Sequence, residues 1–340
     1  MKVFNEIQAF ETSMGVRVYQ IPIEAFPGLW TFAYLVAFAD ELVLIDSGSG
    51  IGDSNQQLSD GITEAGLTNT DHKFRLEDLT HVLITHGHID HFGGLNYILS
   101  RSNALVGVHE LDRRNLTNYE ERRVIILRRM ENYLIEAGVE AEGRENLLGF
   151  YRYTKQLFKS APVDFSYEKI GMTLGEFEFL HVPGHCAGHV VIRLHDILFC
   201  GDHILTDITP HQAPEQLTAW TGLDHYLHSL DAVEQWSDGI NLALCGHKKV
   251  ITDLPARITE IRAMHMERLD LVMEFFGSAN TIQDLSKSLF GKANGYNALL
   301  AIEEAGAHVE YLYQRGKLAI ENYDQLESTE EPSTLFYKRQ

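Results

Sequence analysis

A stretch of ten residues constrains the fold of this chain more than any other. Residues 85–94 have the sequence THGHIDHFGG and directly follow an apolar run, LTHVLI, at residues 79–84. A short apolar run of this kind is typical of a buried strand, and the pattern of residues 95–99 is that of a helix that begins after a turn. The sequence therefore predicts a strand, a histidine-rich turn and a short helix.

The predicted turn contains three histidines and one aspartate within six residues. His86 and His88 are two residues apart, so their side chains point the same way from an extended segment. Asp90 and His91 lie beyond the bend, where they can face a second point nearby. Neutral imidazole and carboxylate groups are the ligands that zinc and similar metals prefer, so the turn is a predicted metal site.

The pattern His-x-His-x-Asp-His after an apolar strand resembles the signature of the metallo-β-lactamase superfamily of metal-dependent hydrolases. The family pattern continues with a histidine, a bridging aspartate and a last histidine. This chain has a match to each, at the end of an apolar run: His185 in VPGHCAGH at residues 182–189, Asp202 in FCGDH at residues 199–203, and His247 in LCGH at residues 244–247. The resemblance spans about residues 15–250.

The resemblance implies an α+β fold, the four-layer αββα sandwich in which two sheets pack face to face between outer helices. It also implies two divalent metal ions, most commonly zinc, although iron or manganese would suit the same ligands. A metal-bridging hydroxide, formed because the metals lower the pKa of water toward ~7, would attack the substrate. Carried over position by position, the ligands are His86, His88 and His185 for the first metal, Asp90, His91 and His247 for the second, and Asp202 as the bridge.

Further residues around the ligands have expected roles. Asp90 could also take part in proton transfer. Asp46, in the sequence DSGSG, resembles the family's first motif, where an aspartate orients metal ligands; a simple strand-end or cap residue is an equal alternative. His189 is expected to form hydrogen bonds rather than bind metal. His211 is a weaker candidate for the pocket wall, and Cys186 is expected to be a buried, inert thiol.

The chain is long enough for one large domain and a smaller one. Residues 1–254 are the expected catalytic domain, with a helical insertion at 111–160 that either covers the metal site as a lid or lies away from it. Residues 255–325 resemble the winged-helix tail of the lactamase-beta-2-like branch of the superfamily. This region would serve packing or dimerisation, so a homodimer is one option. The tail at 326–340, rich in Ser, Thr, Glu and Pro, is expected to be partly disordered.

Charge and composition restrict the partners. The net charge of −20 disfavours nucleic acid and anionic membrane surfaces, and Glu303, Glu304 and Glu310 make the C-terminal region poorly basic for binding DNA. No apolar run approaches the roughly 20 residues of a membrane span. Three cysteines without a paired spacing fit a reducing compartment. We therefore expect a cytoplasmic protein that acts on a small molecule.

Departures from the patterns of individual subfamilies narrow the expected reaction. Metallo-β-lactamases commonly have cysteine where Asp202 stands, and flavodiiron proteins have glutamate in place of His88. Lactonases usually carry a tyrosine soon after the bridging aspartate, where this chain has His203. We expect a dinuclear hydrolase of a small ester or thioester, of the glyoxalase II or thioesterase kind. The alternative is an endoribonuclease or a winged-helix nucleic-acid binder, and a lactonase is a further option.

Overall fold

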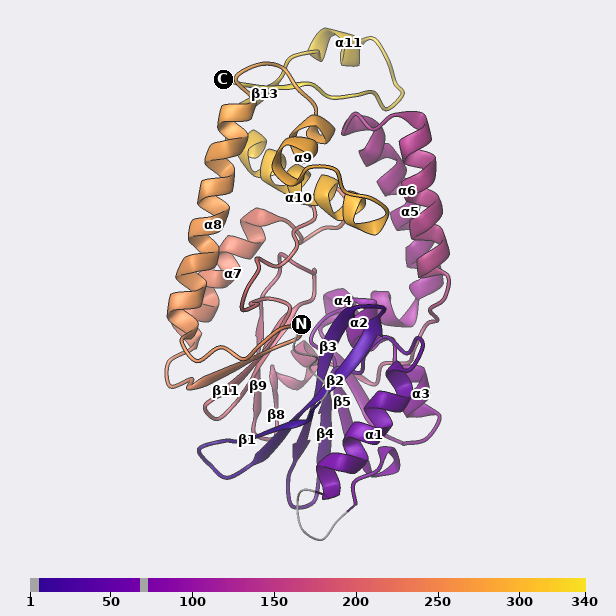
Figure 1. Ribbon diagram of the computed structural model, residues 1–340, viewed down its shortest axis with the longest axis vertical. Helices are drawn as coiled ribbons and strands as arrows, with labels where there is room; N and C mark the ends of the chain where they lie inside the picture. Colours follow the sequence, from indigo (N-terminus) through magenta and orange to yellow (C-terminus); the bar gives the residue numbers. More distant parts are fainter. Residues whose placement is uncertain (1–5, 68–72) are drawn as a thin grey trace.

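A computed structural model of the chain describes residues 6–67 and 73–340 (Figure 1). Two sheets form its centre within these residues. The first has seven strands in chain order: β1 (Gln8–Glu11), β2 (Arg17–Phe26), β3 (Leu29–Ala37), β4 (Leu42–Ile45), β5 (His81–Leu83), β6 (Leu105–Val108) and β7 (Phe165–Ser166). The second has five, in the order β12 (Leu242–Cys245), β11 (Ile197–Gly201), β10 (Val190–Leu194), β9 (Phe177–His181) and β8 (Thr173–Leu174).

The strand directions place several strand ends at one edge. Strands β1 to β4 are antiparallel, whereas β4, β5, β6 and β7 run parallel to one another. In the second sheet β11 and β12 are also parallel. The carboxyl ends of β4 and β5, and likewise those of β11 and β12, therefore open onto the same side of their sheets.

The two sheets pack face to face because their strands are apolar on both faces. In β2, Tyr19, Ile21 and Ile23 belong to the apolar cluster on the helix side, whereas Val18 belongs to the cluster between the sheets. This division follows the alternation of side chains along a strand. Between the sheets, the ring centroids of Tyr34 and Phe199 lie 5.3 Å apart.

Helices cover the outer face of each sheet, which confirms the predicted four-layer αββα sandwich. Helix α1 (Ser54–Leu67) buries Leu58 and Ile62 against the first sheet, and α7 (Leu223–Trp236) packs against the outer face of the second. The other helices are α2 (Ile89–Phe92), α3 (Leu95–Leu99), α4 (Glu110–Thr117), α5 (Tyr119–Glu136), α6 (Ala141–Lys155), α8 (Leu254–Phe275), α9 (Ile282–Phe290), α10 (Tyr296–Gln314) and α11 (Tyr323–Glu327). None of the helices in the described ranges is long and apolar enough to cross a membrane.

The insertion and the C-terminal helices pack against each other. Figure 1 shows α8 rising on one side of the sandwich, α5 and α6 on the other, and α9 and α10 between them. The Tyr133 hydroxyl of α5 donates to the carbonyl of Ile302 in α10, at 2.8 Å. Residue 306 is glycine where the helices cross, because a Cβ there would lie 1.9 Å from the Tyr133 hydroxyl oxygen.

The C-terminal region shares its apolar core with the catalytic sandwich. Leu299, Ile302 and Val309 of α10 belong to the same buried cluster as Leu198 and Ala243 of the second sheet. Helix α9 begins at a capping box formed by Thr281 and Asp284. Within the tail that was expected to be partly disordered, β14 (Tyr337–Arg339) instead pairs antiparallel with β13 (Leu318–Ile320).

Candidate metal centre

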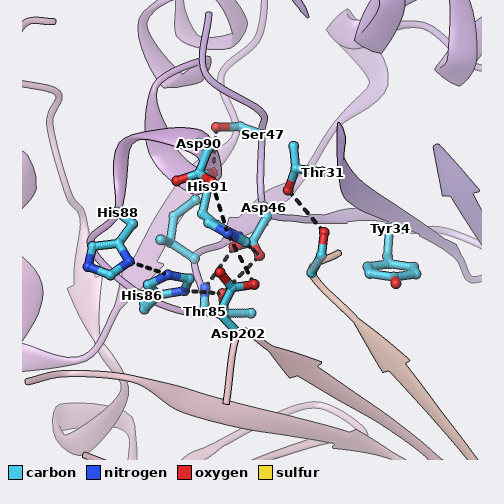
Figure 2. A network of polar contacts seen from close by, with 12 residues as sticks. Thr31, Tyr34, Asp46, Ser47, Thr85, His86, His88, Asp90, His91 and Asp202 are labelled. Carbon is cyan, nitrogen blue, oxygen red and sulfur yellow. Dashed lines mark hydrogen bonds and ion pairs between the residues drawn. The ribbon is translucent and has the colours of Figure 1, made fainter. Parts of the chain in front are cut away.

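The seven predicted ligands come together at the edge where the strand ends open. His86 and His88 lie in the loop after β5, and Asp90 and His91 lie in the short helix α2. His185 follows β9, Asp202 follows β11 and His247 follows β12. Figure 2 shows His86, His88, Asp90, His91 and Asp202 converging, with Asp46 beside them.

The ligand atoms form two neighbouring groups joined by Asp202. One atom each of His86, His88 and His185 lies within 4.8 Å of the others, and the same holds for Asp90, His91 and His247. The Asp202 carboxylate lies 3.8 Å from His185 Nε2 in the first group. It also lies 3.2 Å from His247 Nε2 and 3.5 Å from His91 Nε2 in the second group. This arrangement matches two metal positions with Asp202 between them.

Buried atoms without hydrogen-bond partners test whether a metal fits. His91 Nε2, His185 Nε2 and Asp202 Oδ1 are all buried and accept or donate no hydrogen bond within the described residues. An unpaired buried polar group typically costs about 1–3 kcal/mol. Because these three atoms belong to the same cluster and are ligand types that divalent metals accept, the residues fit a dinuclear metal site.

Hydrogen bonds to the backbone orient the histidine rings. The Nδ1–H of His185 donates to the carbonyl of His211 at 2.7 Å, and that of His247 donates to the carbonyl of Trp30 at 2.6 Å. A carbonyl can only accept, so each ring in its neutral form carries its Nε2 lone pair toward the site. The backbone thus selects the tautomer that a metal requires.

Asp46 ends β4 and also contacts His91, one of the candidate ligands. It follows β4 with a φ of 59°, a left-handed conformation that non-glycine residues seldom adopt. Its Oδ2 lies 2.8 Å from His91 Nδ1, and its Oδ1 accepts the backbone N–H of Thr85 at 2.8 Å. The carboxylate therefore fixes the ring of His91 and the start of the loop that carries His86.

The two ligand groups, which form the two halves of the site, differ in the charge around them. Burial, reinforced by the neighbouring histidines His91 and His189, holds the pKa of His86 well below its usual value. Burial also lowers the pKa of His185. In the other half, burial opposes protonation of His247, but Asp202 and Asp90 outweigh it and raise the pKa of His247 to about 10. The first half therefore offers neutral imidazoles, the form that binds metal, and the second concentrates carboxylate charge.

His189 lies against residues of the ligand cluster. Its ring stacks on that of His86, with the centroids 4.6 Å apart. Its Nε2 accepts the backbone N–H of Asp202 at 3.1 Å. His189 therefore contacts a histidine of one ligand group and the aspartate that joins the two groups.

Helix α10 secures the loop that follows Asp202. His211 Nε2 lies 2.9 Å from a carboxylate oxygen of Glu303. Glu304 accepts the backbone N–H of Gln212 at 2.7 Å, and Glu310 accepts that of Glu215 at 2.8 Å. The sequence interpretation treated these glutamates only as charges that disfavour DNA. The structure shows that they contact the loop whose carbonyl at residue 211 orients His185.

A further cluster that could hold a metal has a structural explanation instead. His265, Glu304 and His308 offer ligand atoms within 4.8 Å of one another. However, Arg268 already pairs with Glu304 at 2.7 Å, and His308 Nδ1 donates to the carbonyl of Glu304 at 2.8 Å. A buried divalent cation beside Arg268 would lack compensating charge, so we assign this cluster to the packing of α8 on α10.

Comparisons with known proteins agree with this geometry. A family model described as the metallo-beta-lactamase superfamily matches residues 29–247. The atrochrysone carboxyl ACP thioesterase dmxR1 of Cryptosporiopsis sp. (strain 8999) is 24% identical over 250 residues, which is 71% of this chain and 58% of that protein. The chain thus spans less than two thirds of the length of that curated relative.

Solved structures share the fold. The metallo-beta-lactamase family protein TTHA1429 from Thermus thermophilus has a TM-score of 0.73 at 23% identity, with 95% of this chain and 98% of that chain covered. A beta-lactamase domain protein from Burkholderia ambifaria has a TM-score of 0.74 at 19% identity, with 98% and 94% covered. Both likenesses extend through the C-terminal helices as well as the sandwich.

Proposed function

The chain belongs to the metallo-beta-lactamase superfamily, and we propose from this premise that it is a dinuclear metal-dependent hydrolase of a small thioester or ester. The observation that carries the proposal is the convergence on one cluster of three buried ligand atoms that lack a hydrogen-bond partner within the described residues: His91 Nε2, His185 Nε2 and Asp202 Oδ1. The ligand set of imidazoles and carboxylates suits zinc, which we propose as the metal.

The residues have separate parts in the proposed reaction. When bound, two metal ions supply Lewis acidity and lower the pKa of water toward ~7. Asp202 lies between the two ligand groups and holds them at a fixed separation. The side chain of Asp90 is 15% exposed and that of Asp202 is 10% exposed. We assign to the ionised Asp90 carboxylate the acceptance of a proton from the attacking water and its delivery to the leaving group.

The choice of a thioester or ester rests on two observations. Asp202 occupies the position where cysteine is common in antibiotic-hydrolysing relatives, which disfavours lactam substrates. The matched curated relative is named as a thioesterase, which supports thioester cleavage although the identity is 24%.

Substitution of a ligand tests this proposal. His88→Ala removes one imidazole of the first group at a partly exposed position, so we expect the fold to persist. Hydrolysis of a thioester panel should fall by more than about 100-fold, since even outer partners of metal ligands typically contribute 10- to 100-fold. His228→Ala is the control, because His228 lies in α7 with its side chain 76% exposed.

The assay should pair activity with metal content and circular dichroism for each variant. A His88→Ala protein that keeps full activity and its metal would refute the ligand assignment. Loss of activity in His228→Ala as well would show that the assay reports something other than the site.

We further infer the roles of the regions outside the sandwich. Helices α8, α9 and α10 with β13 and β14 would form the winged-helix-like unit of the lactamase-beta-2-like branch. The buried contacts of α10 with residues 211–216 support a packing role for it rather than nucleic-acid binding. Helices α5 and α6 would form one wall of the substrate pocket, and the protein would act in the cytoplasm.

A further inference from the structure

Asp112 is a buried carboxylate that the proposed reaction does not use. It lies in the first turn of α4, where the insertion begins, and its exposed fraction is 0%. Its oxygens accept hydrogen bonds from the backbone N–H of Gly87 at 2.7 Å and of Gly188 at 3.0 Å. They also accept from the Cys186 thiol, at 3.1 Å for the nearer oxygen, and from the Asn115 amide at 3.0 Å.

The two backbone donors belong to different ligand loops. Gly87 stands between His86 and His88, and Gly188 lies in the segment that starts with His185. One carboxylate therefore ties together the two loops that supply all three histidines of the first ligand group. Because its two oxygens accept from four donors, the buried carboxylate of Asp112 is well satisfied by hydrogen bonds.

Helix α4 approaches both contact positions closely, through Asn115 and Asp112 at residue 87 and through Asp112 at residue 188. A Cβ at residue 87 would lie 2.7 Å from the Asn115 amide nitrogen and 3.1 Å from the carboxylate carbon of Asp112. A Cβ at residue 188 would lie 2.6 Å from the backbone nitrogen of Asp112 and 2.8 Å from its Cβ. Neither glycine has a positive φ, so space rather than backbone conformation favours glycine there.

The contacts continue into the insertion. Asn115 accepts a hydrogen bond from Arg122 Nε at 2.8 Å, so a chain of polar groups leads from α5 to the ligand loops. Cys186 is 5% exposed, and burial together with Asp112 raises the pKa of its thiol well above the usual value. The thiol therefore stays protonated and acts as a donor, consistent with the expected inert cysteine.

We propose that Asp112 is a positioning residue that fixes the spacing of His86, His88 and His185 by clamping their two loops. The inference rests on the proposed metal centre, because it concerns how tightly that centre holds metal. Within residues 6–67 and 73–340, the hydrogen bonds of Asp112 go to backbone groups and to Asn115 and Cys186, and none goes to a ligand side chain. Its effect would therefore appear as weaker metal binding at the first group, with the second group unchanged.

The test is Asp112→Asn, with Zn²⁺ affinity measured by competition against a chromogenic chelator. An amide replaces one accepting oxygen by a donor, which must then face either the Gly87 or the Gly188 N–H. We expect one of the two Zn²⁺ affinities to fall by about 10- to 100-fold, the range typical of residues that orient metal ligands. The control is Asp164→Asn, since Asp164 is exposed and accepts a backbone N–H from Val106 away from the ligands.

A second pair of variants keeps the test decisive if Asp112→Asn does not fold. Gly188→Ala introduces the close contact with Asp112 and should weaken the same Zn²⁺ site. Gly149→Ala, whose Cβ would meet nothing within 4 Å, should leave both affinities unchanged. If folded Asp112→Asn or Gly188→Ala binds Zn²⁺ with wild-type affinity, the inference about Asp112 is wrong and the proposed function still stands. A wild-type protein that binds no Zn²⁺ would overturn the proposed function and the inference with it.

Discussion

Asp46 illustrates how a single residue prepares the metal site. It accepts from the Thr85 backbone N–H and from the Thr85 hydroxyl, and it lies 2.8 Å from His91 Nδ1. The carboxylate also contributes to raising the pKa of His91, which burial alone would lower. A ligand that must keep one orientation in a buried site thus gains both a geometric and an electrostatic partner.

Replacement of Asp46 by asparagine changes the side-chain contacts but should keep the backbone conformation. Asparagine tolerates a left-handed conformation, so the strand end at φ 59° should be kept. The amide has only one accepting oxygen, so it cannot accept from both the Thr85 backbone N–H, which faces Oδ1, and His91, which faces Oδ2. We therefore expect metal affinity and activity to fall by about 10- to 100-fold. Competition against a chelator measures the metal affinity, and thermal unfolding of the metal-free protein measures whether the fold is kept. Asp46→Asn with wild-type metal affinity would mean that His91 needs no such partner.

At the residue scale, the local sequence pattern predicted the candidate ligands and two residues beside them, Asp46 and His189, but it did not predict a role for Asp112. His86, His88, Asp90 and His91 are close in the chain, so their proximity is visible in the sequence itself. Asp112 looks like an ordinary acidic residue in the first turn of a helix, and its role arises only when the loops at 87 and 188 fold onto it. The sequence carried one indirect signal, which is the glycine at each of those positions.

At the scale of elements, α10 packs against the sandwich and shares its buried apolar cluster. The sequence predicted a boundary near residue 254, because the pattern of strands changes there to long helices. In the structure, Leu299, Ile302 and Val309 share a buried cluster with Tyr226 and Leu230 of α7. Helix periodicity identifies an apolar stripe but not the surface that covers it, which is why the sequence could not place this helix.

Truncation tests that conclusion. A chain ending at residue 254 would expose the apolar side of α7 and leave the Gln212 and Glu215 N–H groups without Glu304 and Glu310. We expect it to aggregate or to lack cooperative unfolding, and to bind no metal tightly. A truncated protein that unfolds cooperatively with wild-type metal content would show instead that the sandwich is independent of the C-terminal helices. Size-exclusion chromatography and thermal melts distinguish the two results.

At the scale of the whole molecule, the net charge of −20 disfavours the alternative function, a nuclease. The buried glutamates of α10 disfavour it as well. Nucleic-acid binding gains most of its affinity from basic side chains against phosphates. The fold itself does not decide between substrates, because one fold serves many reactions. Function therefore has to be read from the metal centre and its surroundings.

The most direct measurement is the metal content of the purified wild-type protein, taken together with its hydrolysis of thioesters, esters, lactones and RNA. The dinuclear arrangement predicts about two zinc ions per chain, thioester or ester turnover that a chelator removes and zinc restores, and no cleavage of RNA. Absence of bound metal, or hydrolysis that survives its complete removal, would contradict a metal-dependent hydrolase built on His86, His88, Asp90, His91, His185, Asp202 and His247.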